Sequence, residues 1–461
     1  MNIEEIISTE RSNEKIIADL KKKSIVVPSW TKLEAEYNPM KHPVMDTALY
    51  RDKFNANGGV VERVTRYTLG LQKLAVKRMT ELLFGLPVTR VYDAKNEQQK
   101  LVAQIMEDIF KRNRINSINI ERGRALYASC EVVTLWYSQE MQTAYAGQMN
   151  SYKLRCKNFS PMNGDAIYPL FDEYDDMVAL SIEYSRTEGE KTITYFDTYT
   201  ADKHIRWRTS GGVSEIDIEE NIDLGKITAI YGTRPEPIWE GQSANVYEAE
   251  WTLSRNGNYI RKNARPNWVV FSDEDVNFGG EAPGSEEGRN VMQYSSNSRA
   301  EYVTWQQAIE SIKFHIEEIK RNFFMELQLP DMSMDNMKAT PMSGEARKMM
   351  FIDAQMKATD ESGLWYEYFD REVNVVRAFM KKMYPALATA IDELSVEVII
   401  TPYQIQDEAE KITNLTNATG GKAVMSQRTA IKYLGYADDV DTEMEQIAKE
   451  DMGDVFEQPV M

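Results

Sequence analysis

The residues of this 461-residue sequence best suited to chemistry are carboxylates, and they gather in three short acidic stretches. They are FDEYDD at 171–176, EIDIEE at 215–220 and SDEDV at 272–276. Carboxylate oxygens are ligands that Mg²⁺ prefers, so each stretch could in principle hold a metal ion. All three are predicted to lie in loops or turns, where Asp is frequent for backbone reasons. We therefore interpret them as solvated turns and predict no metal site.

The sequence contains neither a zinc-binding histidine pattern nor a P-loop. The three histidines, His42, His204 and His315, lie far apart in the sequence and outside any zinc-binding spacing. The stretch TGGKAV at 419–424 lacks the spacing and the hydroxyl residue of a phosphate-binding P-loop. The sequence thus predicts no enzyme and no cofactor. A metal-dependent DNA-processing enzyme remains an alternative, and its activity would depend on Asp175 and Asp176.

Composition narrows the class of protein further. A length of 461 residues favours two or more domains. The net charge of −18 disfavours wrapping nucleic acid, which needs clustered Lys and Arg, but it suits a surface past which DNA slides. Two cysteines form no disulfide framework and indicate a reducing cytoplasm. The N-terminus has no secretory pattern, and no apolar run is long enough to span a membrane.

Periodicity predicts the elements of the first half of the chain. One helix is expected to end at Gly85, and a second is expected over 97–113. The first carries a face spaced by threes and fours, formed by Val64, Leu71, Leu74, Ala75, Met79, Leu82 and Leu83. Between about 129 and 232, short runs rich in β-branched and aromatic residues alternate with Gly, Asp and Asn. They predict a mostly antiparallel sheet or meander, with TSGG at 209–212 as one turn.

Two long helices are predicted on either side of a small insert. The first covers 243–264, with Gly257 as a weak point. The insert offers strand candidates at 267–271 and 291–294 around an acidic loop. The second helix, over 301–328, has an apolar stripe along its whole length that needs a partner. The stripe is formed by Tyr302, Trp305, Ile309, Ile312, Ile316, Ile319, Phe323 and Leu327.

A methionine-rich loop follows at 329–342 and separates two helices. It carries Met332, Met334, Met337 and Met342 between Pro330 and Pro341. Ser343 is a plausible N-cap for a further long helix that reaches toward Tyr384. A strand near 395 and helices near 405–416 and 426–434 complete the pattern.

Several stretches, in order, resemble the portal proteins of tailed bacteriophages. LLFGLPV at 82–88 resembles a step in the portal wing, and 243–270 resembles the first stem helix leading into the clip. The 300–323 stretch is similar to the returning stem helix, and 342–358 to the start of the long helix after the tunnel loop. The stretch 426–451 resembles the C-terminal pattern of serine, helix, acidic turn and helix. The resemblance covers residues 60 to 451.

The resemblance implies an α+β portal fold divided into seven parts. They are a mixed wing at 1–242, a first stem helix at 243–265, a small α/β clip at 266–300, a second stem helix at 301–328, a tunnel loop at 329–342, a long wing helix and strand at 343–398, and a helical crown at 399–461.

The resemblance also implies a function and a set of partners. Such a protein forms a homo-oligomeric ring, usually of twelve copies, at one capsid vertex, and double-stranded DNA is packaged and ejected through it. Terminase large subunit and then head-completion or adaptor proteins dock on the clip, and the capsid and scaffolding proteins surround the ring. We expect it in the virion, and in the host cytoplasm during assembly. The closest alternative is another ring-forming connector or tail adaptor, which would lack an insert like 266–300.

Three groups of candidate residues follow from that resemblance. The DNA-facing tunnel loop comprises Met332, Ser333, Met334, Asp335, Asn336, Met337 and Lys338. The clip surface that binds partners comprises Asp273, Glu274, Asp275, Glu281, Glu286 and Glu287. Packing between stems is expected from Trp305, Ile309, Ile312, Ile316, Ile319 and Phe323. Met suits a loop that touches DNA loosely, because it is adaptable, apolar and makes few directional hydrogen bonds.

Overall fold

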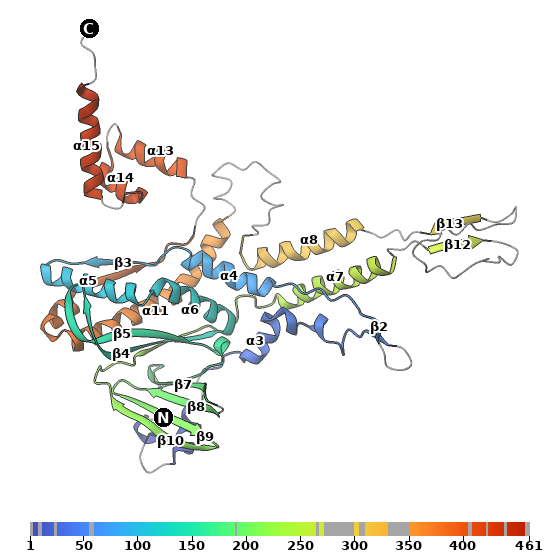
Figure 1. The fold of residues 1–461 in the computed structure, drawn as a ribbon, viewed down its shortest axis with the longest axis horizontal. Helices are drawn as coiled ribbons and strands as arrows, with labels where there is room; N and C mark the ends of the chain where they lie inside the picture. The colour runs from blue at the N-terminus through green and yellow to red at the C-terminus, as the bar shows by residue number, and fades with distance from the viewer. Residues whose placement is uncertain are drawn as a thin grey trace, which may run out of the picture.

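The computed structural model describes most of the chain. The described residues are 3–7, 12–22, 25–54, 60–189, 191–263, 267–271, 299–303, 309–330, 351–403, 408–420, 423–437 and 440–456. Figure 1 shows an elongated molecule with a mixed body, a pair of helices projecting from one side and a group of C-terminal helices above. Among the described residues, none of the helices has the length and apolar character needed to cross a bilayer.

Helices pack at the centre of the body. The first part of the chain contributes α1 (Ile3–Ile6), α2 (Asn13–Leu20), α3 (Trp30–Tyr37), the short turns η1 (Pro39–Lys41) and η2 (Pro43–Met45), β1 (Lys53–Phe54), β2 (Val60–Glu62), α4 (Leu71–Phe84), β3 (Thr89–Asp93), α5 (Glu97–Arg112) and α6 (Ile115–Ser129). The predicted helices ending at Gly85 and covering 97–113 are confirmed as α4 and α5. Val64 was wrongly placed on the first of them. Gly70 forms the N-cap of α4, and the Val64 amide instead donates to Asp52.

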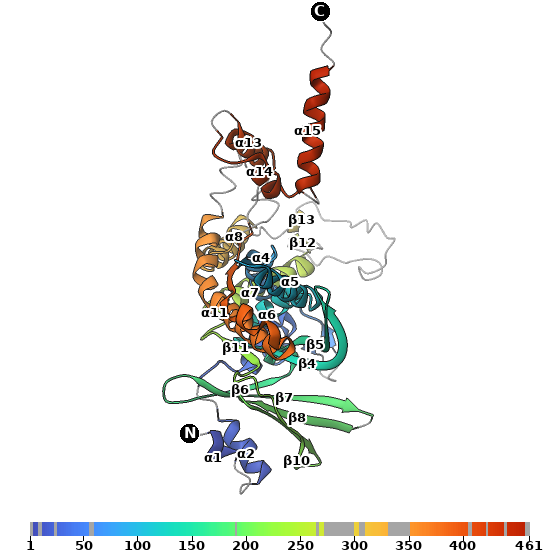
Figure 2. The ribbon, with the colours of Figure 1, turned by 90° about the vertical axis from the view of Figure 1, so that its left-hand side faces the viewer.

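The long helix α11 (Ile352–Met383) runs through this core (Figures 1 and 2). Its Trp365 ring packs edge-on against Phe84 of α4 at 4.9 Å between centroids. Tyr368, one turn further along, lies against Gly232 of the sheet, where an added Cβ would stand 2.9 Å from the Tyr368 ring. A glycine is therefore needed there for the helix to approach the sheet. One face of α11 is apolar and is buried at Trp365, Phe369, Val373, Val376 and Met380.

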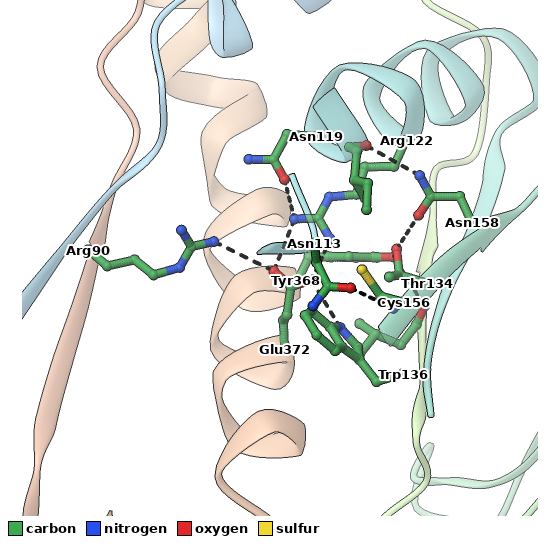
Figure 3. A network of polar contacts seen from close by, with 12 residues as sticks. Arg90, Asn113, Asn119, Arg122, Thr134, Trp136, Cys156, Asn158, Tyr368 and Glu372 are labelled. Carbon is green, nitrogen blue, oxygen red and sulfur yellow. Dashed lines mark hydrogen bonds and ion pairs between the residues drawn. The ribbon is translucent and has the colours of Figure 1, made fainter. Parts of the chain in front are cut away.

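A buried polar network joins α11 to α6 and to the neighbouring sheet (Figure 3). The Arg122 guanidinium donates to both carboxylate oxygens of Glu372, at 2.8 and 3.0 Å, and the Trp136 indole donates to the same carboxylate at 3.2 Å. Arg122 is fully buried and Glu372 is 1% exposed. Burial alone would lower the pKa of Arg122, but the Glu372 carboxylate raises it above its ordinary value.

The predicted antiparallel β region is confirmed, and it forms two sheets rather than one. Its elements are β4 (Glu131–Tyr145), β5 (Gln148–Phe159), the turn η3 (Pro161–Asn163), β6 (Ala166–Phe171), β7 (Met177–Glu188), β8 (Lys191–Tyr199), β9 (Lys203–Ser210), β10 (Val213–Asn221) and β11 (Ala229–Thr233). The order is β11-β4-β5 in one sheet and β10-β9-β8-β7-β6 in the other. The TSGG turn joins β9 to β10, with Gly211 and Gly212 at φ of 62° and 88°.

The five-stranded sheet has an apolar cluster on each face. One cluster faces the three-stranded sheet, and helices α1 and α2 cover the other (Figure 2). The acidic stretch 215–220 lies within strand β10, so its prediction as a turn is wrong. Alternating isoleucines at 216 and 218 already carried the period of a strand, which the density of carboxylates obscured.

Buried Asp197 of β8 is held by cations from the next strand. The Arg206 Nε and Nη2 atoms donate to its two oxygens at 2.7 and 2.9 Å. The Tyr184 hydroxyl donates at 3.1 Å, and His204 Nε2 lies 3.9 Å away. Burial would raise the pKa of Asp197, but the nearby His204 and the hydrogen bonds and charge of Arg206 lower it overall.

The described part of the rest of the chain forms ten further helices, turns and strands. They are α7 (Ser243–Asn263), β12 (Asn267–Phe271), β13 (Arg299–Val303), α8 (Ile309–Glu326), η4 (Pro385–Leu387), α12 (Ala388–Glu393), β14 (Ser395–Ile399), α13 (Glu408–Thr419), α14 (Gln427–Leu434) and α15 (Val440–Phe456). The strand expected near 395 is confirmed as β14, which pairs antiparallel with β3. Helix α14 begins after Ser426, whose hydroxyl accepts from the Thr429 amide, and ends at Gly435 in the left-handed region.

We predict that Glu372→Gln costs about 3–5 kcal/mol of unfolding free energy, because it leaves the Arg122 charge buried without a counter-charge. Denaturant unfolding at neutral pH measures the loss. Glu367→Gln is the matched control on the same helix, since its pair with Arg371 is exposed and should change stability little. Equal midpoints for the two variants would contradict a structural role for the buried pair.

We also predict that Asp197 contributes to the acid sensitivity of folding. Its pKa is lower in the folded chain than the ordinary value of 3.8. Its stabilising contribution is therefore present above that value and is lost as the pH falls through the lower, folded pKa. The stability difference between wild type and Asp197→Asn should shrink between about pH 5 and pH 2, measured by denaturant unfolding. A difference that stays constant over this range would rule out the assignment.

Candidate functional site: the two-helix stem and its anchorage

Helices α7 and α8 lie side by side and project from the body as a two-helix stem (Figure 1). Beyond them the chain pairs β12 with β13, with Asn267 opposite Val303 and Phe271 opposite Arg299. The predicted first helix and the strand at 267–271 are confirmed. The predicted start of the second helix at 301 is wrong, because residues 299–303 form a strand. Tyr302 fitted the helical stripe, but an aromatic residue followed by the β-branched Val303 also suits a strand.

The apolar stripe of α8 is buried only at the end near the body. Ile319 is 9% exposed, and Phe323 is fully buried. Ile312 and Ile316, farther out along the helix, are half-buried. Of the other residues predicted to pack in the stem, Trp305 and the side chain of Ile309 lie outside the described part. Helix α7 therefore does not fully cover the apolar stripe of α8 over the length that the structure describes.

Large apolar side chains also stand exposed on both stem helices. They are Tyr259 and Ile260 on α7, and Phe314 and Met325 on α8, each more than half exposed. His315 is half exposed, and its Nε2 lies 3.7 Å from Glu248 across the two helices. A soluble monomer rarely gathers so many exposed apolar side chains on one projecting element.

The direction of α7 is set by hydrogen bonds to an extended segment, 63–70. Glu250, Ser254 and Asn258 lie four residues apart on one face of α7. They accept from the amides of Leu69, Tyr67 and Thr65, at 2.7, 2.9 and 2.7 Å. Four helical residues rise about 6.0 Å, and two extended residues span about 6.6 Å, so the two repeats match.

Gly257 allows the close approach of that segment. A Cβ added there would lie 2.9 Å from Thr65 and 3.0 Å from Tyr67. The sequence suggested only a weak point in a helix, whereas the structure gives this glycine a packing role. The signal was present in the four-residue spacing of Glu250, Ser254 and Asn258, but the amides that they bind are more than 180 residues away along the chain.

His42 contacts the same Glu250 carboxylate oxygen that accepts from the Leu69 amide. Its Nδ1 lies 2.7 Å from Glu250 Oε1, and its Nε2 lies 2.8 Å from the carbonyl oxygen of Glu36. Both His42 and Glu250 are at most 1% exposed. The far ends of α7 and α8 therefore extend from a base that is held firmly to the body.

The base of α8 marks where the methionine-rich segment leaves the body. Gln328 adopts a left-handed φ of 54°, and the Leu329 amide donates back to the Phe324 carbonyl at 3.0 Å. Arg78 of α4 stacks over the Phe324 ring at 4.5 Å and donates to the Pro330 carbonyl. Residues 331–350 lie outside the described part, and the chain resumes at buried Phe351. Both ends of this segment are thus attached to the body.

The remaining candidate residues lie outside the part of the chain that the structure describes. The tunnel-loop candidates from Met332 to Lys338 lie in the 331–350 range, outside the described residues. The six acidic clip candidates and the strand predicted at 291–294 lie within 272–298, which is also outside the described residues. The N-cap proposed at Ser343 lies outside them too, within 331–350. Their predicted roles are neither confirmed nor excluded.

The acidic stretch at 171–176 serves a turn between β6 and β7. Asp172 Oδ1 accepts from the amides of Tyr174 and Asp176, at 2.9 and 3.0 Å. This carboxylate is therefore used by the backbone, as the sequence suggested. Across the described ranges, no group of three or more His, Cys, Asp or Glu residues is arranged to hold a metal ion.

Known proteins provide an independent comparison. No curated protein sequence matches this chain. Similar solved structures include one described as "Virion of native gene transfer agent (GTA) particle", with 11% identity, a TM-score of 0.41, and coverage of 92% of this chain and 98% of that chain. A second, "Neck of empty GTA particle computed with C6 symmetry", has 10% identity, a TM-score of 0.42, and coverage of 87% and 95%.

A sequence family gives a more specific result. The family described as "Phage portal protein, SPP1 Gp6-like" matches residues 30–455. That match runs through the helical core, both sheets, the stem and the C-terminal helices. The chain therefore belongs to the phage portal protein family.

Proposed function

We propose that this chain is the subunit of a portal ring at one capsid vertex, through which double-stranded DNA is packaged and later ejected. Family membership supports the general role. The observation that carries the proposal is the half-buried stripe on α8, because a projecting helix pair with an open apolar face needs a partner of the same kind. A second copy of the chain supplies that partner.

The ring follows from placing equivalent stems side by side. The open part of the α8 stripe, at Ile312 and Ile316, packs on the stem of the next copy, whose α7 carries exposed Tyr259 and Ile260. Such a head-to-tail contact between unlike faces closes into a ring when the rotation between copies is a whole fraction of a full turn, without a rise along the axis. We propose twelve copies, as the resemblance implies.

A channel for DNA also fits the charge of the chain. Each subunit carries a net charge of −18, so a ring of copies repels phosphate and limits the contacts that would slow DNA. We propose that residues 329–342 reach the channel and form its narrowest part, with Met332, Met334 and Met337 nearest the DNA. The described residues before and after 331–350, Pro330 and Phe351, are both attached to the body, which supports a fixed base for this segment.

The end of the stem is the proposed docking surface. Residues 266–300 would form the clip, with Asp273, Glu274 and Asp275 turned toward a basic surface of the terminase large subunit. Head-completion or adaptor proteins would take the same place after packaging, while the capsid and scaffolding proteins contact the outer wing. The ring itself would have no enzymatic activity in this scheme.

We predict that changing both Ile312 and Ile316 to Ala weakens ring assembly more than it weakens the fold. Both side chains are only half-buried within one subunit, so the apolar area lost is mainly area that a neighbouring copy covers. Native mass spectrometry over a dilution series should show rings dissociating at higher protein concentration than for wild type.

Two controls separate assembly from folding. Phe323→Ala removes a fully buried side chain of the same helix and should cost about 3–5 kcal/mol of unfolding free energy in any oligomeric state. Lys320→Ala alters an exposed position and should change neither property. If the Ile312 and Ile316 double variant keeps the wild-type ring mass throughout the dilution series, the proposed contact is absent.

We predict that Met334→Lys together with Met337→Lys impairs DNA packaging without impairing ring formation. Two added cations per subunit would create phosphate contacts around the ring and resist sliding. The defect should be larger at low salt, where the attraction is least screened. The readout is the amount of nuclease-protected DNA in assembled particles at two salt concentrations.

The conservative control is Met334→Leu with Met337→Leu. It keeps the apolar character and most of the volume, so packaging should stay near the wild-type level. Packaging by the lysine variant that equals wild type at low salt would contradict a DNA-facing position for this segment.

A further inference from the structure

A cationic pocket lies in the body, at the turn between α5 and α6 and against strand β3. Its volume is about 600 Å³. Three cations line it, together with uncharged polar side chains and one carboxylate, Glu107. The cations are Arg90, Lys111 and Arg114, and the uncharged polar side chains include Thr89, Asn116 and Ser117. A cationic excess of this kind stands out in a chain with a net charge of −18.

Two of these cations are available to a ligand. Lys111 and Arg114 are exposed at the pocket, and neither forms an ion pair or a side-chain hydrogen bond with another described residue. Glu107 is engaged, since it accepts a hydrogen bond from the Tyr92 hydroxyl at 2.9 Å. Glu107 offsets part of the positive charge, and the three cations against this one carboxylate in the lining leave the pocket with a cationic excess.

The third cation lies at the back of the pocket and is buried. The Arg90 side chain is 3% exposed, and its Nε and Nη2 atoms have no hydrogen-bond partner. Its nearest carboxylate, Glu372, is 3.9 Å away, and Arg122 and Trp136 already hydrogen-bond to that carboxylate. The guanidinium also lies over the Phe110 ring, 3.8 Å from its centroid, so Arg90 contributes positive charge behind the pocket while its Nη2 lies on the Glu372 side.

Backbone donors converge on the same place. Helix α6 has 15 residues and starts after Arg114, which adopts a left-handed φ of 52°. The amides of Ser117 and Ile118 bond to the Arg114 carbonyl, which leaves those of Ile115 and Asn116 ahead of the first helical hydrogen bonds. At the end of α5, the Asn113 amide and side chain both donate to the Ile109 carbonyl, which reduces the negative charge of that helix terminus.

We propose that this pocket binds a phosphate group, held by Lys111 and Arg114 and by the first amides of α6, with Arg90 adding positive charge from behind. Free inorganic phosphate and a DNA phosphodiester present the same tetrahedral oxyanion, and both fit this chemistry. The inference does not depend on ring formation, because every residue involved comes from one subunit. It gives an otherwise acidic chain one defined place of contact with an anion.

The test uses the full-length chain and a double variant, Lys111→Gln with Arg114→Asn. Asparagine tolerates the left-handed conformation of residue 114, so the variant removes charge without adding backbone strain. Lys100→Gln is the matched control, since Lys100 is an exposed cation on α5 outside the pocket. Unfolding midpoints of all three proteins confirm that they are equally folded.

Two probes separate the sources of the phosphate. Inorganic phosphate is titrated by calorimetry in a phosphate-free buffer, and a short DNA duplex is titrated by fluorescence anisotropy at low salt. We expect wild type and Lys100→Gln to bind at least one probe, and the double variant to bind it roughly tenfold more weakly or worse. Loss of inorganic phosphate binding assigns the pocket to the free anion, and loss of duplex binding alone assigns it to DNA. Binding of neither probe by wild type, or equal binding by all three proteins, overturns the proposal.

Discussion

The ion pair between Arg122 and Glu372 is the contact on which the rest of the body depends. It lies where α6, α11 and strand β4 meet, and the Trp136 indole donates to the same carboxylate. Two charges removed from water are stabilising only when their remaining hydrogen-bonding groups are satisfied. Here the two bonds to Arg122 and the one from Trp136 fulfil much of that requirement for Glu372. The Tyr368 hydroxyl, one turn away, extends the network to Thr134 at 2.7 Å.

That contact links the parts of the chain that a portal subunit has to hold in register. Helix α11 begins directly after residues 331–350, and α6 leads into the long strand β4. A second fixed point lies at the base of the stem, where α7 binds the segment 63–70 through Glu250 and its neighbours. The stem and the ends of the methionine-rich segment are therefore attached to one rigid core. A ring built from such subunits would pass force between stem and channel through packed side chains.

Local signals in the sequence predicted much of this fold. The helices over 97–113 and 243–264 and the strand at 267–271 were found because apolar spacing and turn residues lie within the elements themselves. The start of α8 was misplaced because Tyr302 fits the helical stripe by its spacing from Trp305, although it pairs with Trp268 in a strand. The stretch 215–220 was misread for a similar reason, since its carboxylates are typical of turns but stand on a strand.

The contacts between distant segments could not be predicted in the same way. Charged residues such as Arg122 and Glu372 look like surface residues until the fold brings them together from 250 positions apart. One signal was available, because Glu372 stands among Tyr368, Phe369 and Val376 on a helical face that is otherwise apolar. The candidate residues in 272–298 and 331–350 came from the family resemblance, and they remain predictions.

The most direct measurement of the central proposal is electron cryomicroscopy of the purified full-length chain, with native mass spectrometry of the same sample. The account predicts closed rings of one defined copy number, with α7 and α8 of neighbouring copies in contact around a central channel. Monomers at every protein concentration, or rings in which the stems face solvent and do not touch, would contradict it.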